Sequence, residues 1–217
     1  MADVIREYKA VTEHRENIVW RVLVGVYAIV LFAVNAINVP NNVFWCDEAF
    51  SANLSVMSVK EMLVATAADV HPPLYYFLIM GATRIFGTSG YVYRIVSLIP
   101  LALMMLFSMS LLWKRFGKEV SIVFITLISL LPNAYIKNTE VRMYSWAFMF
   151  VLATFWITFL LIEKETTFRY VLLGIFGLLA AYSHYYALIS VVPFFVIVMC
   201  VTILKKRHMG GYCSHGA

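Results

Sequence analysis

The sequence predicts an all-α membrane protein: a polytopic helical bundle of about six transmembrane helices, with interfacial helices in the first outer loop. Of the 217 residues, 62% are hydrophobic and 13% are charged, whereas a soluble domain carries about 25% charged residues. Several apolar blocks are long enough to cross a bilayer, which takes about 20 helical residues. Basic residues flank these blocks, so the net charge of +5 reflects membrane topology and does not indicate a nucleic-acid partner.

The apolar blocks predict the spans in chain order. The first block, 22–39, follows the polar segment 1–21 and is longer than the core of a signal peptide, so it predicts a retained signal anchor. The later blocks are 91–113, 119–137, 142–162 and 168–204. The last block is long enough for two spans that break at 183–186, the first of them short. Pro132 is expected to kink the third span, and Pro193 is tolerated inside the sixth.

The apolar segment Leu74–Phe86 has about 13 residues, which suits an interfacial or re-entrant helix better than a span. If it does not span, the N-terminus and every short basic loop are cytoplasmic, as the positive-inside rule expects; these loops are Lys114–Lys118, Glu163–Arg169 and Lys205–Arg207. Residues 40–90 then form one large extracytoplasmic loop, and the tail 205–217 is cytoplasmic. Helical spacing of apolar residues predicts an interfacial helix within Ser55–Val70.

The outer loop carries three candidate site residues. Asp47 and Glu48 are adjacent, so in a helix or strand one can enter a site while the other pairs elsewhere. A partly desolvated aspartate at the interface can act as general base toward an acceptor hydroxyl; the alternative is a solvated loop pair that caps an interfacial helix. His71 precedes two prolines, which favour an extended backbone, and it either serves the site or only marks a helix start.

Further candidates lie at the outer ends of the spans. Arg94 either recognises a phosphate at headgroup depth or extends to water. Glu140 and Tyr144 are four residues apart and are predicted to share a helix face, with Arg142 pointing elsewhere; a carboxylate at a helix N-terminus also has a purely structural explanation. His184 either belongs to an aromatic belt or lines a site. Together these residues favour a site for a phosphorylated, membrane-borne substrate.

The order of these motifs resembles the GT-C superfamily of membrane glycosyltransferases. The motifs are Trp45-x-Asp47-Glu48-Ala49, Asp69-Val70-His71-Pro72-Pro73-Leu74, Arg94 and Glu140-x-Arg142-x-Tyr144. They are most similar to the branch of protein O-mannosyltransferases and lipid A aminoarabinose transferases, over about residues 20–204. The resemblance implies transfer of a sugar from a polyprenyl-phosphate donor, with inversion, to a glycan, lipid or protein acceptor on the extracytoplasmic face of a bacterial-type plasma membrane.

The resemblance also implies residue roles within a transmembrane module at 22–204. Asp47 is the catalytic base and Glu48 positions acceptor or donor. Arg94 holds the donor phosphate, and His71 lies near that phosphate or near an optional divalent metal, the one possible cofactor. The same cavity is lined by Glu140, Arg142 and Tyr144.

Two other interpretations stay open. A transporter or flippase for a lipid-linked substrate would use Arg94 and Arg142 as headgroup contacts, but it predicts ionisable residues near mid-membrane, and the predicted spans hold almost none. Family members are usually longer and the tail 205–217 resembles none of their elements, so an inactive, truncated membrane fragment is the other alternative. The three cysteines form neither a metal motif nor a disulfide framework.

Overall fold

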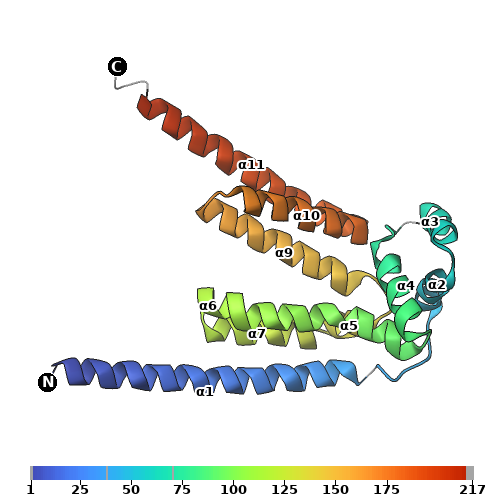
Figure 1. The fold of residues 1–217 in the computed structure, drawn as a ribbon, viewed down its shortest axis with the longest axis horizontal. Helices are drawn as coiled ribbons and strands as arrows, with labels where there is room; N and C mark the ends of the chain where they lie inside the picture. Colours follow the sequence, from blue (N-terminus) through green and yellow to red (C-terminus); the bar gives the residue numbers. More distant parts are fainter. Residues whose placement is uncertain (1, 38, 70, 214–217) are drawn as a thin grey trace.

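The computed structural model describes residues 2–37, 39–69 and 71–213, and within these ranges the chain forms helices and connections but no strand (Figure 1). The helices are α1 (Ala2–Ala36), α2 (Cys46–Val56), α3 (Val59–Ala67), α4 (Leu74–Phe86), α5 (Gly90–Phe107), the π-helix η1 (Ser108–Leu112), α6 (Trp113–Phe116), α7 (Lys118–Leu130), α8 (Pro132–Thr139), α9 (Tyr144–Glu163), α10 (Thr167–Ser183) and α11 (Tyr185–Cys213). The predicted all-α membrane bundle is confirmed.

Four helical stretches in the described part of the chain are long and apolar enough to cross a membrane, namely Arg15–Ala36, Gly90–Phe116, Tyr144–Glu163 and Tyr185–Lys205. The pair α7–α8 makes a fifth if its two helices, bent by 67°, count as one broken span. The shorter α10 has 17 residues and stands where the sequence predicted a short span. The break between α10 and α11 falls at His184, as expected, and α11 continues past the expected start of the tail to Cys213.

The long helices run side by side, and α2, α3 and α4 gather at one end of the bundle, away from both termini (Figure 1). α4 has the predicted bounds and begins after Pro73. Its tyrosines and aliphatic residues pack with α2, α3, α5 and the start of α9 into a buried cluster that includes Leu54, Met62, Tyr75, Ile79 and Met143. This cluster supports the end of the bundle where the candidate site lies.

The segment between α1 and α4 contains two short helices. The helix expected within Ser55–Val70 is present as α3 (Val59–Ala67), and α2, whose span was not predicted, precedes it and begins at Cys46. The chain turns at Met57, and Ser58 caps the start of α3. The Ser58 hydroxyl accepts a hydrogen bond from the Glu61 amide, and the Glu61 carboxylate accepts one from the Ser58 amide. Asp47 and Glu48 therefore lie in the first turn of a helix.

The bend between α7 and α8 confirms the kink predicted at Pro132. The Ile128 carbonyl would bond to residue 132 in a continuous helix, but proline has no N–H. Asn138 Nδ2 donates to that carbonyl instead, at 2.9 Å, and also to Asn35 Oδ1 at 2.9 Å. Asn35 Nδ2 in turn donates to the Ser129 carbonyl at 3.2 Å. Two buried asparagines thus join α1 to the freed backbone groups of the bend.

Replacing Asn35 with leucine should lower the free energy of unfolding by about 1–2 kcal/mol, because it removes the donor to the Ser129 carbonyl and the acceptor of one Asn138 amide N–H in an apolar setting. Thermal unfolding in detergent measures this loss. The matched control is Asn133→Leu, since Asn133 is exposed on α8. Equal midpoints for the two variants would contradict a bridging role for Asn35.

Candidate active site

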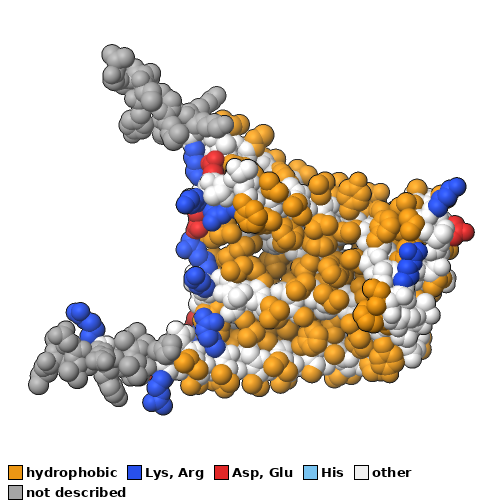
Figure 2. Space-filling model, viewed as in Figure 1, with side chains coloured by type: hydrophobic (Ala, Val, Ile, Leu, Met, Phe, Trp, Pro, Cys, Tyr) orange, Lys and Arg blue, Asp and Glu red, His pale blue; other side chains and the backbone are white. Residues whose placement is uncertain are grey.

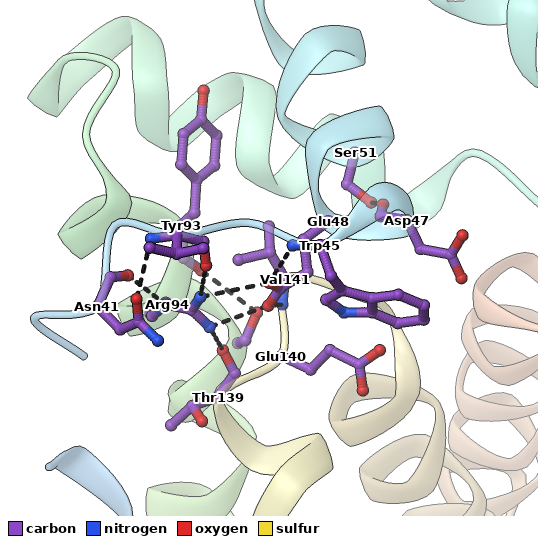
Figure 3. A network of polar contacts seen from close by, with 12 residues as sticks. Asn41, Trp45, Asp47, Glu48, Ser51, Tyr93, Arg94, Thr139, Glu140 and Val141 are labelled. Atoms are coloured by element: carbon purple, nitrogen blue, oxygen red, sulfur yellow. Dashed lines mark hydrogen bonds and ion pairs between the residues drawn. The ribbon is translucent and has the colours of Figure 1, made fainter. Parts of the chain in front are cut away.

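The two adjacent carboxylates separate into different environments at the start of α2. Glu48 is buried, whereas Asp47 is half-buried and its carboxylate points away from Glu48 (Figure 3). This confirms that the neighbours face different directions, as successive residues of a helix must. Within the described residues the Asp47 carboxylate has no hydrogen-bonding or ionic partner, although its backbone carbonyl accepts from Ser51 and Arg142.

Glu48 forms a bidentate ion pair with Arg94 of α5. Arg94 Nη1 donates to Oε1 at 2.9 Å and Nη2 donates to Oε2 at 3.3 Å. The guanidinium also donates to three backbone carbonyls, those of Asn41, Val43 and Thr139, at 2.7–3.0 Å. A guanidinium has five N–H groups, and all of them are taken up by these five bonds. Arg94 is therefore buried and saturated inside the protein, so in this conformation it has no N–H left for a phosphate.

Glu48 also binds two backbone amides. Its Oε1 accepts from Val141 N–H at 2.9 Å and its Oε2 accepts from Trp45 N–H at 3.4 Å. The first bond lies in the connection between α8 and α9, which holds residues 140–143. α9 begins only at Tyr144 and Glu140 has an extended backbone, so the prediction that these two residues share a helix face is wrong. In the connection Glu140 has an extended backbone, and the amide that follows it bonds to Glu48.

Arg142 also contacts α2 and is also buried. Its Nη1 donates to the Asp47 carbonyl at 3.3 Å and to Ser51 Oγ at 3.4 Å. Its Nη2 lies 3.2 Å from His71 Nε2, and in the described part of the chain its buried Nε has no hydrogen-bond partner. Arg142 therefore links the helix that carries Asp47 to the loop that carries His71, and it retains an unused donor.

His71 and His184 bring two further segments to Arg142. The Asp69 carboxylate lies 3.0 Å from His71 Nδ1, and the His71 and His184 rings are 5.5 Å apart. Burial lowers the pKa of His184, and the nearby His71 and Arg142 lower it further. His184 is therefore neutral near pH 7. The connection between α10 and α11 thus contacts the site through the uncharged His184 ring, which packs against His71.

Glu140 points in the same general direction as Asp47, away from Arg94 (Figure 3). Glu140 is buried, and Lys137 Nζ lies 2.5 Å from its Oε2 in an ion pair without hydrogen-bond geometry. The same ammonium lies 4.3 Å from the centre of the Tyr144 ring. Lys137 was missed in the sequence, where its only signal is its position three residues before Glu140.

A groove of about 490 Å³ opens beside these residues, between α5, α7, α8 and α9. We call it the α8 groove; its walls are mainly apolar and its polar lining includes Lys137, Asn138 and Tyr144. Figure 2 shows the face between α9 and α5 as hollowed and largely hydrophobic. No group of three His, Cys, Asp or Glu side chains suited to a metal ion occurs among the residues that the structure describes.

Comparison with protein-family models matches residues 70–213 to the family described as dolichyl-phosphate-mannose-protein mannosyltransferase. No curated protein and no solved structure matches the chain. The matched range contains His71, Arg94 and the residues of the α8–α9 connection, but it begins after Asp47 and Glu48. Roles for these two carboxylates therefore depend on their geometry and on the motif order.

Proposed function

Because the chain belongs to the dolichyl-phosphate-mannose-protein mannosyltransferase family, and so to the GT-C membrane glycosyltransferases, we propose that it transfers a sugar from a polyprenyl-phosphate donor to an acceptor hydroxyl, with inversion. The observation that carries the proposal is the setting of Asp47: its half-buried carboxylate has no partner among the described residues, and its backbone carbonyl is bound by the buried Arg142. A carboxylate without a bound partner among the described residues, on a residue whose backbone a buried arginine holds, suits proton abstraction from an acceptor hydroxyl.

We place the reaction on the extracytoplasmic face of the plasma membrane, with both termini in the cytoplasm. Lysines and arginines line the end of the bundle near the termini, and hydrophobic side chains cover its flank (Figure 2). The positive-inside rule assigns such a basic end to the cytoplasm. The candidate site is at the other end, where α2, α3 and α4 gather (Figure 1).

In the proposed step, Asp47 takes the proton of the acceptor hydroxyl while the acceptor oxygen bonds to the anomeric carbon. The bond between that carbon and the phosphate oxygen breaks on the opposite face, and the electron pair leaves with the phosphate. We assign the phosphate to Arg142, because fewer of its guanidinium N–H groups are bonded to the described residues than those of the saturated Arg94. A guanidinium already held in place stabilises the new charge without reorganising.

The remaining candidates support these two groups. Glu48 and Arg94 position α2 and thereby Asp47, and His71 orients Arg142. We propose that the donor's prenyl chain lies in the α8 groove, whose apolar walls suit it, with Glu140 and Tyr144 near the sugar. The buried charged residues Glu48, Arg94, Glu140 and Arg142 all lie around α2 and the α8–α9 connection, which favours an enzyme over a transporter with mid-membrane charges.

The direct test uses purified protein in proteoliposomes with polyprenyl-phosphate mannose labelled in the sugar, followed by the glucose analogue. We expect protein-dependent loss of label from at least one of these donors when a membrane lipid extract and a serine-rich peptide are both supplied as acceptors. If neither donor loses label at any protein concentration, the proposed activity is excluded for these sugars.

A further inference from the structure

A second apolar groove reaches the same site along α10. Two adjoining cavities of about 400 and 520 Å³ share Leu63, Pro73 and Tyr182 in their walls. The first cavity is also lined by His71, and the second by Phe77 and Leu178. We call the pair the α10 groove; it has no lining residue in common with the α8 groove.

The α10 groove has an apolar end and a polar end. In the second cavity the lining residues of α10 are Ile175, Leu178, Leu179 and Tyr182, a spacing of three and four that belongs to one helix face. They cover about 10 Å along the helix and lead toward His184, whose ring contacts His71. At that end His71 lies against Arg142, which binds the Asp47 carbonyl.

The chemistry of the walls selects the class of occupant. Every side chain lining the second cavity is hydrocarbon apart from the Tyr182 hydroxyl, and the groove is open to the outside, since Leu178 is 62% exposed. An extended peptide in such a groove would leave backbone N–H and C=O groups unsatisfied at membrane depth, which is costly. An acyl or prenyl chain has no such groups, so the groove suits a lipid chain and disfavours a polypeptide.

We propose, resting on the proposed function, that the α10 groove binds the hydrocarbon chain of a hydroxyl-bearing lipid and that this lipid is the sugar acceptor. A headgroup leaving the groove at His71 reaches the Arg142 side of α2, where Asp47 takes the hydroxyl proton as the glycosidic bond forms. Donor and acceptor chains then occupy two separate grooves, and the product is a glycosylated lipid.

The test compares Leu178→Trp, which fills the groove, with Val171→Trp. Val171 is exposed two turns earlier on the same face of α10 and lines neither cavity. Purified protein is given labelled polyprenyl-phosphate mannose, a total bacterial membrane lipid extract and a serine-rich peptide. We expect the wild-type protein to form a new labelled lipid. Leu178→Trp should form at least tenfold less of this labelled lipid, and Val171→Trp should form the same amount as wild type. Label in the peptide that is unaffected by Leu178→Trp would overturn the inference while leaving the glycosyltransferase proposal intact.

A binding measurement separates failure of the inference from failure of the proposed function. Phosphatidylglycerol with a diazirine in its acyl chain is crosslinked to the same proteins in nanodiscs, and the labelled residues are identified by mass spectrometry. Crosslinks at Leu63 and Phe77 that fall at least fivefold in Leu178→Trp, but not in Val171→Trp, support a lipid site even if no donor loses label. Equal crosslinking in both variants means that only bulk lipid covers this surface, and the inference then fails.

Discussion

Replacing Asp47 with asparagine should reduce sugar transfer by about 10²–10⁴-fold, the contribution of a positioned general base. Asparagine keeps the shape of the side chain but cannot take the proton of the acceptor hydroxyl. The measurement is the initial rate of label transfer from the polyprenyl-phosphate donor. Because the Asp47 carboxylate has no partner among the described residues, the thermal unfolding midpoint should stay within about a degree of wild type.

The neighbouring Cys46→Ser supplies the matched control for Asp47, since Cys46 is exposed on the same turn of α2. It should transfer sugar at a rate close to wild type. A fully active Asp47→Asn variant would remove Asp47 from the mechanism, whereas loss of activity in both variants would indicate damage to α2.

Replacing Arg94 with leucine should lower the free energy of unfolding by about 3–5 kcal/mol, because it leaves a buried carboxylate without its counter-ion. Three backbone carbonyls, those of Asn41, Val43 and Thr139, also lose their donor. Thermal unfolding in detergent and the yield of folded protein report this loss. The expected fall is large relative to total stability, so the variant is also expected to lose sugar transfer.

Arg84→Leu is the matched control for Arg94, since Arg84 is exposed on α4. Arg94→Lys distinguishes a positioning role from a phosphate-binding role. Lysine keeps the charge but has three N–H groups in place of five, so a positioning role predicts intermediate stability and a parallel loss of activity. If Arg94→Lys keeps the stability of the wild type but loses sugar transfer, Arg94 and not Arg142 would be the residue that binds the donor phosphate.

Those parts of the fold that depend on local sequence were predictable. The length of an apolar block predicts whether a helix can span, so α4 and the shorter α10 were both anticipated. Pro132 lacks an N–H, and it predicts the bend. In contrast, Glu48 pairs with a residue 46 positions away and Asn35 with one 103 positions away. Such pairs leave no local pattern in a single sequence, because they depend on which helices become neighbours.

The candidate site shows the same division. The sequence identified the residue types and predicted that Asp47 and Glu48 face apart, which the structure confirms. It could not say which arginine is committed to the interior, because Arg94 and Arg142 are both arginines near the outer end of a span. Only the partners distinguish them: Arg94 is saturated by Glu48 and backbone carbonyls, whereas the buried Nε of Arg142 has no partner among the described residues.

The partners of Glu48 also set an order of events during synthesis. Chains emerge from their N-terminus and domains fold as their parts become available. Glu48 leaves the ribosome early, but Arg94 follows 46 residues later and Val141 follows 93 residues after Glu48. The Glu48 carboxylate therefore has no counter-ion until the start of α5 has been made, and its bond to Val141 forms only after α7 and α8. The geometry around Glu48 is completed only when the α8–α9 connection reaches it, so the candidate site is the last part of this region to mature.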